Sequence, residues 1–173
     1  MIYVISATTR HGSFSLKVAE KYVQILTESG QQAELCSLDS MPLAEYNDQV
    51  YRKGENTLRN YAHRIFLAAE RFVIVAPEYN GSFPGVMKVL LDVCEPDIFL
   101  GKKFALVGVS SGRAGNLRGL DHLTDILHFL RAEVYSLKQP VSRIRQLTNQ
   151  EKELVDDETI RVLSAQCAGF LKF

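Results

Sequence analysis

The sequence predicts an α/β fold in which helices cover both faces of a five-stranded parallel sheet. The main observation is that short apolar runs alternate with longer segments of helical periodicity along the chain. The second is size and composition. The chain has 173 residues, of which 46% are hydrophobic and 23% are charged, which is enough for one well-packed core and too little for two. We therefore expect residues 1–173 to form a single domain.

The first part of the chain supplies two strands and two helices. Ile2–Ser6 predicts the first strand. Ser15–Ser29 predicts the first helix, because its apolar residues recur on one face and Gly30 follows at the stopping position. Ala33–Leu38 predicts the second strand, and a polar connection then leads to a second helix. The predicted inner face of that helix holds Leu58, Tyr61, Ala62, Ile65 and Ala69.

The clearest strand is Arg71–Ala76, a β-branched apolar run that ends at Pro77. Pro84 is expected to open the third helix, because its fixed φ suits a first helical turn. This helix is apolar on nearly every side, so either a partner subunit or two core-facing sides within the chain must cover it. Its apolar residues are Val86, Met87, Val89, Leu90, Leu91 and Val93.

Two further strands and two helices complete the pattern. Phe104–Val109 predicts the fourth strand and Ala132–Leu137 the fifth. The helix between them carries Leu120, Leu123, Leu127 and Leu130. The last helix is expected to begin at Thr148, because Thr148 and Glu151 match a capping box. Acidic residues would then lie early in this helix, where they complement its dipole and indicate a solvated helix start instead of a metal site. They are Glu151, Glu153, Asp156, Asp157 and Glu158.

This order of elements favours a doubly wound, flavodoxin-like sheet with strand order 2-1-3-4-5, and right-handed crossovers fix how each helix wraps. Ligands bind such sheets beyond the carboxyl ends of the strands, near the reversal between strands one and three. The loops after strands one, three and four should therefore decide the function.

The loop after the first strand, residues 7–15, contains groups that bind phosphate. It offers several hydroxyl side chains, the guanidinium of Arg10 and a glycine, and it runs directly into a helix N-terminus. Unpaired N–H groups and the positive end of the helix dipole favour an anion there. The alternative is that Ser13 merely caps the helix and the other residues form a polar turn.

The loop after the third strand, residues 77–85, is the most unusual. Pro77 and Pro84 restrict it at both ends, and Asn80-Gly81 is a turn pair. Glycine at position 81 allows a flat ligand to approach the backbone closely. Glu78 is an alternative catalytic carboxylate, but the sequence places no second carboxylate or histidine near it.

The loop after the fourth strand includes Gly108-Val109-Ser110-Ser111-Gly112, a match to the nucleophile elbow of serine hydrolases. Such an enzyme also needs an acid and a histidine from later strand ends. The only histidines after Ser110 are His122 and His128, and both lie on the helix that directly follows. We therefore reject a serine hydrolase. The sequence also lacks the P-loop pattern and the G-x-G-x-x-G pattern of dinucleotide sites.

Charge and composition limit the partners and the location. Lys plus Arg equals Asp plus Glu at 20 each, which gives no case for nucleic acid or a membrane as the main partner and speaks against a charged electron shuttle. The first residues lack the pattern of a signal peptide, and no apolar stretch approaches the ~20 residues that span a bilayer. Cys36, Cys94 and Cys167 form no C-x-x-C pair and are expected to be buried thiols. A cytoplasmic protein is the expectation.

Taken together, the three loops resemble those of the NADPH-dependent FMN reductase family, flavodoxin-like proteins that include azo-dye, quinone and chromate reductases. The resemblance runs from the first strand to about Pro140. Its most specific part is Pro77–Gly85, which reads PEYNGSFPG and is followed by Met87-Lys88. The phosphate-binding pattern of the family is matched at Thr8, Arg10, Gly12, Ser13 and Phe14, and its third loop at residues 111–115.

The resemblance implies a set of cofactor-binding residues and a homodimer or homotetramer. The FMN phosphate would be held by Thr8, Arg10, Ser13 and Ser15, next to Phe14. The isoalloxazine and ribityl groups would lie along Pro77, Glu78, Tyr79, Asn80 and Gly81. The far edge of the ring would face Ser111, Gly112 and Arg113.

Four positions depart from the family pattern. Ala7 replaces a usual glycine, and Ser15 replaces a usual asparagine but keeps a hydroxyl donor, so phosphate binding should survive. Val89 and Val93 stand where asparagine and tryptophan are common. These two changes affect the expected subunit contact and the pocket of the electron acceptor.

These inferences predict an FMN-dependent NAD(P)H oxidoreductase. Hydride would pass from NADPH or NADH through the flavin to a small acceptor, namely free flavin, a quinone, an azo compound or a metal ion. No side chain is expected to act as an acid or a nucleophile. The alternative is an FMN-binding electron carrier or redox sensor without nicotinamide-dependent turnover. A third possibility, a fold that has lost its cofactor, conflicts with the intact loop 77–85.

Overall fold

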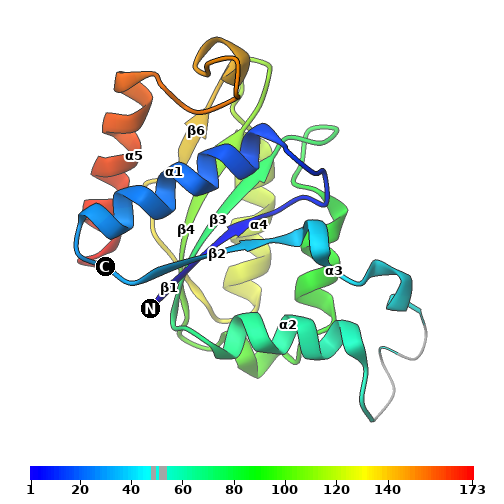
Figure 1. The fold of residues 1–173 in the computed structure, drawn as a ribbon. Coiled ribbons are helices and arrows are strands. Elements are labelled where there is room, and N and C mark those ends of the chain that lie inside the picture. Colours follow the sequence, from blue (N-terminus) through cyan, green and yellow to red (C-terminus); the bar gives the residue numbers. More distant parts are fainter. Residues whose placement is uncertain (48–49, 51–53) are drawn as a thin grey trace.

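The computed structural model describes residues 1–47, 50 and 54–173. Its parallel sheet follows the order β2-β1-β3-β4-β5 (Figure 1). β1 (Ile2–Ser6) pairs with β2 (Ala33–Ser37) on one side and with β3 (Arg71–Pro77) on the other, and β4 (Lys103–Val109) pairs with β3. The predicted flavodoxin-like order is confirmed, and the carboxyl ends of β1, β3 and β4 lie next to one another.

Two short strands share the fifth position of the sheet. β5 (Glu133–Val134) pairs with the start of β4, and β6 (Gln139–Val141) pairs with its end. The predicted single strand Ala132–Leu137 is therefore wrong, because the chain leaves the sheet after Val134 and returns at Gln139. Proline at position 140 is compatible with an edge strand, where no further neighbour needs its missing N–H group.

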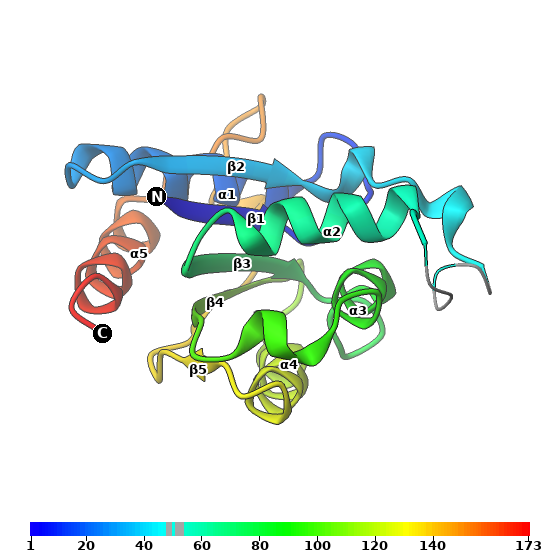
Figure 2. The same cartoon turned by 90° about the horizontal axis from the view of Figure 1, so that it is seen from below.

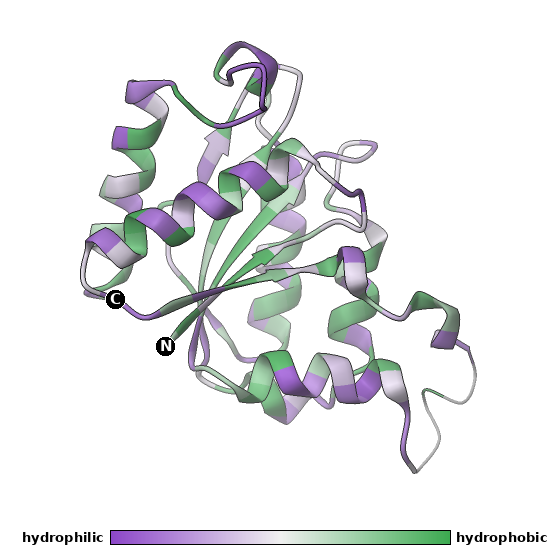
Figure 3. Cartoon of the chain, viewed as in Figure 1, coloured by the Kyte–Doolittle hydropathy of each residue, from purple (hydrophilic) through white to green (hydrophobic). Residues whose placement is uncertain are grey.

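Helices cover both faces of the sheet (Figures 1 and 2). One face carries α1 (Phe14–Glu28) and α5 (Asp157–Phe170), and the other carries α2 (Thr57–Leu67), α3 (Gly85–Asp92) and α4 (Leu117–Phe129). Successive residues of a strand point to opposite faces. In β3, Phe72 and Ile74 accordingly pack under α2–α4, whereas Val73 and Val75 pack under α1 and α5. Figure 3 shows mostly apolar strands between helices in which apolar and polar residues alternate.

Most of the apolar surface of α3 is covered within the chain. Met87, Leu90 and Leu91 are buried, and Val86 and Val89 are half-buried against the same core. Two core-facing sides within the chain therefore explain most of the apolar surface of this helix, and a partner subunit is not needed to cover that part.

The last helix begins later than the sequence predicts. α5 starts at Asp157, and Asp156 is its N-cap, with Oδ2 accepting a hydrogen bond from the backbone N–H of Thr159 at 2.8 Å. The predicted start at Thr148 is wrong. The Thr148 hydroxyl donates instead to the carbonyl of Ile144 at 3.2 Å.

The residues between Thr148 and the true helix start form a narrow turn. Thr148 and Leu154 make an isolated antiparallel bridge, and Lys152 has a φ of 64°, in the left-handed region that a right-handed helix cannot contain. Glu151 and Glu153 consequently belong to this turn and not to the helix. Only Asp156, Asp157 and Glu158 of the predicted acidic cluster lie at the start of α5.

None of the described helices is both long and apolar enough to cross a bilayer. The three cysteines are free thiols. Cys94 and Cys167 are buried, but Cys36 is half-buried, contrary to expectation. Burial raises the pKa of Cys36 to about 11 and that of Cys94 to about 12, so both stay protonated and weakly nucleophilic at neutral pH.

Candidate cofactor site

The three predicted loops meet at one end of the sheet. The Ala7 N–H donates to the carbonyl of Val75 at 3.0 Å, and the Glu78 N–H donates to the carbonyl of Val109 at 2.8 Å. These bonds make the loops start side by side, and a cleft of about 120 Å³ lies among them. The cleft is lined by Arg10, Ser13, Phe14, Ser15, Pro77, Glu78, Tyr79, Val109, Ser110 and Ser111.

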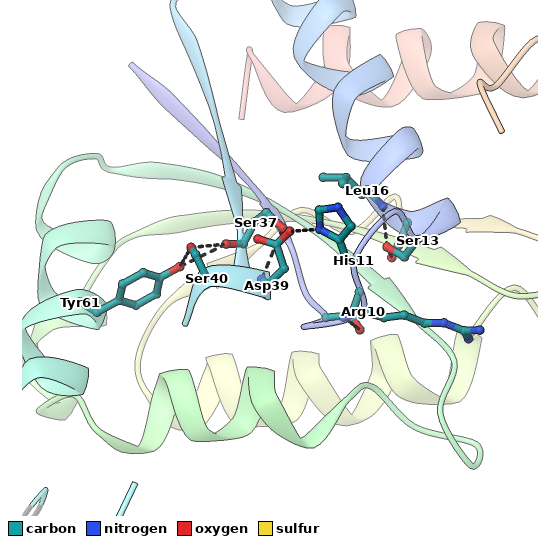
Figure 4. A network of polar contacts seen from close by, with 10 residues as sticks. Arg10, His11, Ser13, Leu16, Ser37, Asp39, Ser40 and Tyr61 are labelled. Atoms are coloured by element: carbon teal, nitrogen blue, oxygen red, sulfur yellow. Dashed lines mark hydrogen bonds and ion pairs between the residues drawn. The ribbon is translucent and has the colours of Figure 1, made fainter. Parts of the chain in front are cut away.

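The first loop ends in a helix cap that also faces the cleft. Ser13 is the N-cap of α1, because its Oγ accepts a hydrogen bond from the Leu16 N–H at 3.1 Å (Figure 4). The same oxygen lies 2.9 Å from Oγ of Ser15, a residue only 1% exposed. The capping role considered for Ser13 is therefore confirmed. It coexists with a place on the cleft wall, so the first turn of α1 presents hydroxyls and helix N–H groups to the same space.

Thr8 links the first loop to the second. Its Oγ1 lies 2.9 Å from the Tyr79 hydroxyl oxygen and accepts a hydrogen bond from the Arg10 N–H at 3.2 Å. Thr8 is buried and is not among the cleft-lining residues. Its hydroxyl thus holds the backbone of Arg10 and the ring of Tyr79 in place.

A second contact ties the same loop to the end of β2. Nδ1 of His11 lies 3.2 Å from a carboxylate oxygen of Asp39, in the turn that follows β2 (Figure 4). The Arg10 side chain extends away from this pair, and Arg10 is one of the residues that line the cleft. The loop is therefore fixed on both sides while its guanidinium stays at the site.

The second loop is closed by a two-residue turn. Tyr79 and Ser82 exchange backbone hydrogen bonds of 2.8 and 3.1 Å, and Asn80 and Gly81 both have positive φ values, 52° and 79°. Asn-Gly is the preferred pair for such a turn. The predicted turn at Asn80-Gly81 is confirmed. It leaves these two residues at the tip, outside the set that lines the cleft.

Asn116, a residue that the sequence analysis did not single out, fastens the second loop to α4. Its Nδ2 donates to the carbonyls of Ala76 and Pro77 at 3.0 and 3.1 Å, and the residue is 1% exposed. It has a φ of 64°, which asparagine tolerates better than most residues. Gly119 leaves room for this side chain, because an added Cβ would clash with Oδ1 of Asn116 and lie 2.7 Å from the backbone nitrogen of Phe83. The one sequence feature that could have indicated this residue is its position, an asparagine just before a helix.

The third loop is held together by Ser110. Its Oγ donates to the carbonyl of Gly112 at 3.0 Å and accepts from the N–H of Gly115 at 3.0 Å. A hydroxyl that both donates and accepts a hydrogen bond within its own loop has a structural role, which agrees with the rejection of a serine nucleophile. Ser111 lines the cleft, while Gly112 and Arg113 are exposed beside it.

Glu78 is fixed through its backbone at the floor of the site. Its carboxylate is mostly buried and lies 3.9 Å from the exposed guanidinium of Arg118, a loose ion pair across the start of α4. Arg118 also packs beside Gly81, 3.8 Å from where a Cβ would stand. Arg118 is thus a second cation near the loop that sequence reasoning missed.

Comparisons with known proteins show which family the chain resembles. The sequence model of the NADPH-dependent FMN reductase family matches residues 1–143. The chain is 30% identical over 168 residues to an NAD(P)H-dependent FMN reductase of Pseudomonas aeruginosa, which covers 94% of this chain and 88% of that protein. It is 32% identical over 177 aligned residues to a quinone reductase of Escherichia coli, with 99% and 94% covered.

A solved structure shows the same fold. The flavoenzyme NAD(P)H:(acceptor) oxidoreductase FerB from Paracoccus denitrificans matches with a TM-score of 0.80 at 20% identity, covering 99% of this chain and 94% of that one.

Proposed function

The chain belongs to the NADPH-dependent FMN reductase family, and on this premise we propose that it is an FMN-dependent NAD(P)H oxidoreductase that reduces a small-molecule acceptor. Residues 1–173 would form a single FMN-binding domain. The observation that carries the proposal is the helix start at Ser13, where hydroxyls and helix N–H groups face a cleft bordered by the loop 77–85.

The donor set of the first loop suits a phosphate. Ser13 and Ser15 place hydroxyls on the cleft wall, and Arg10 supplies a guanidinium beside them. The first turn of α1, which is described throughout, contains no acidic residue. Hydroxyls, a cation and a helix N-terminus are the groups that bind phosphate dianions in proteins. Phosphate contacts are accordingly assigned to Ser13, Ser15 and Arg10, with Thr8 as their support and Phe14 alongside.

The rigid second loop suits the flat ring system. Pro77, Glu78 and Tyr79 line the cleft, and the turn at Asn80-Gly81 is held by two backbone bonds. A loop fixed in this way positions backbone groups without reorganising when a ligand arrives. On the other side, Ser111, Gly112 and Arg113 are proposed to face the far edge of the ring.

FMN supplies the hydride chemistry when it is bound. The chain's own residues hold the phosphate, fix the ring and leave one of its faces open to the donor and the acceptor. Ser110 is committed to bracing its loop, and the thiols of Cys36 and Cys94 are held protonated by burial. No covalent intermediate on the protein is needed.

We also propose that the protein is cytoplasmic and acts as a homodimer or homotetramer. Three cysteines without a disulfide suit a reducing compartment. An apolar groove of about 510 Å³ lies between α3 and α4, and its rim includes Phe129, which is 82% exposed. Aromatic side chains such as phenylalanine are enriched at the cores of protein interfaces.

Reconstitution of the purified protein with FMN tests the proposal. We expect a bound flavin spectrum that bleaches anaerobically on addition of NADPH or NADH and returns when a quinone, azo dye or free flavin is added. A protein that binds no FMN contradicts the proposal outright. A protein that binds FMN but leaves both nicotinamides unoxidised is instead a carrier or sensor.

A further inference from the structure

The segment 142–154 lies against two of the three cofactor loops. Its start is bound to the third loop: the Arg143 N–H donates to the carbonyl of Gly112 at 2.8 Å, and the Ile144 N–H donates to that of Ser110 at 3.0 Å. In Figure 1 the segment arches, in orange, over the sheet end where α1 begins. Only its first two residues fall within the part of the chain that the family sequence model matches, which ends at residue 143.

The far end of this segment reaches the first loop. Nζ of Lys152 donates to the carbonyl of Gly12 at 3.0 Å, across 140 positions of sequence. The turn that presents Lys152 is well fixed, because the Glu153 N–H donates to Oδ1 of Asn149 at 2.9 Å and Leu154 is buried in the core. The segment therefore connects the first and third loops, and its own backbone is held in place at the turn around Lys152.

Two cations of this segment flank the first residue of α1. Nζ of Lys152 and Cζ of Arg145 each lie 5.6 Å from the centre of the Phe14 ring. A positive charge beside the positive end of a helix dipole is unfavourable by itself. A bound anion attracts both the charge and the helix end, so the combined interaction becomes favourable. Phe14 and Ser13 both line the cleft, so the two cations contact a residue of the cleft wall.

The contact with Gly12 also orients the loop. A peptide unit is planar and trans, so fixing the Gly12 carbonyl fixes the direction of the following Ser13 N–H. Gly12 has a φ of 57°, a conformation that places it at a sharp bend just before the helix. Because the C=O and N–H of a trans peptide point in opposite directions within its plane, a lysine bound to this carbonyl leaves the N–H directed away from the lysine.

We propose that Lys152 is a positioning residue for the phosphate of FMN, acting through the Gly12 carbonyl and through its charge, with Arg145 as a weaker helper. This inference rests on the proposed function and concerns only the phosphate end of the cofactor. It therefore separates FMN from riboflavin, which has the same ring and ribityl chain without the phosphate.

The test is titration of the apoprotein with FMN and with riboflavin, followed by flavin fluorescence at low and high salt. Lys152→Met should raise the Kd for FMN about tenfold, the size expected for loss of one charge-assisted contact. It should leave the Kd for riboflavin within about twofold of the wild type, and Lys152→Arg should restore most of the FMN affinity. The FMN penalty should shrink at high salt, because salt screens exposed charges. Lys172→Met, which removes an exposed lysine at the chain end, is the charge-matched control.

The outcomes separate cleanly. Equal loss of FMN and riboflavin affinity would mean that Lys152 only supports the fold near the loop, and unchanged FMN affinity would mean that it has no role. Either result overturns the proposal while leaving the function intact. A wild-type protein that binds neither flavin contradicts the proposed function itself.

Discussion

The starts of α1 and α5 lie on the same face of the sheet but are built in opposite ways. α5 begins with its own negative charges: Asp156 caps it, and Asp157 and Glu158 occupy its first turn. α1 begins with the neutral cap Ser13 and no acidic residue in a first turn that is described in full. A helix N-terminus favours negative charge in both cases. In α5 the sequence supplies that charge, whereas the first turn of α1 supplies none.

The surroundings of the two helix starts strengthen the difference. The hydrogen bonds of Asp156 to Thr159 hold the pKa of that carboxyl below its usual range, so α5 keeps its negative cap. At α1 the cations Lys152 and Arg145 lie beside the ring of Phe14, the first residue of the helix. The start of α5 thus carries negative charge of its own, and we propose that the start of α1 receives it from the phosphate. Substitutions that change the charge or the cap at the helix starts test this difference.

Ser13→Asp should have the largest effect, because it gives α1 the kind of start that α5 has. Aspartate is as good an N-cap as serine, so the fold should remain stable. Its carboxylate would occupy the proposed phosphate position, and repulsion between charges a few ångströms apart should raise the Kd for FMN at least about 100-fold. Flavin fluorescence titration measures it.

Riboflavin is the control for that variant, because it lacks the repelled group. Its Kd should change less than about threefold, since no phosphate is involved. If FMN bound Ser13→Asp as tightly as the wild type, the phosphate would have to lie elsewhere.

Asn116→Asp extends the comparison to α4, whose N-cap side chain faces back toward β3. The substitution keeps the size but replaces the Nδ2 donor by a carboxylate oxygen against the carbonyls of Ala76 and Pro77. We expect the free energy of unfolding to fall by about 2 kcal/mol, the cost of buried acceptors left unpaired. Chemical denaturation measures this loss.

The matched control is Asn56→Asp at the start of α2. There the side-chain Oδ1 accepts a hydrogen bond from the Arg59 N–H at 3.0 Å, a role that aspartate fills equally well. Equal stability losses in the two variants would show that the Asn116 amide is not the link between α4 and the loop 77–85.

Asp156→Ala should have the smallest effect and none on flavin binding. Loss of the α5 cap should lower Tm by about 3 °C near neutral pH. Because folding lowers the pKa of Asp156, its stabilisation is present above the unfolded value near 4 and is lost as pH falls below it. The Tm difference from the wild type should therefore shrink below about pH 4. Ser13→Ala removes a cap that does not titrate, so the Tm difference between this variant and the wild type should stay constant with pH. Thermal melts between pH 3 and 7 measure both differences. A Tm difference that stays constant for Asp156→Ala and shrinks for Ser13→Ala would contradict the prediction.

The sequence predicts the parts of the site that depend on local chemistry. Asn80-Gly81 determines a turn by itself, because both residues tolerate positive φ, and Ser13 before an apolar-periodic run predicts a cap. The start of α5 could not be decided in this way. Threonine and aspartate both cap helices, so residue type alone does not decide between Thr148 and Asp156. The left-handed backbone at Lys152 excludes a helix that starts at Thr148.

The remaining errors arise from contacts between distant segments. The second half of the divided fifth strand depends on such a contact: Pro140 of β6 packs against Gly115, where an added Cβ would lie 2.5 Å from the proline side chain. Likewise, Asn116 and Lys152 act on carbonyls far away in the sequence, and no residue pattern reports which carbonyl a side chain will reach. The positioning residues were therefore missed, whereas all cleft-lining residues except Val109 and Ser110 were predicted.

The ³¹P resonance of FMN bound to the wild-type protein tests the central claim most directly, because it reports the phosphate alone. A free phosphate monoester takes up a proton near pH 6. A phosphate held by the start of α1, with hydroxyls and cations around it, should remain a dianion, so its chemical shift should stay constant between about pH 5.5 and 8. A shift that titrates near pH 6, as in free FMN, would show that the phosphate is in solvent and that this helix start does not bind it.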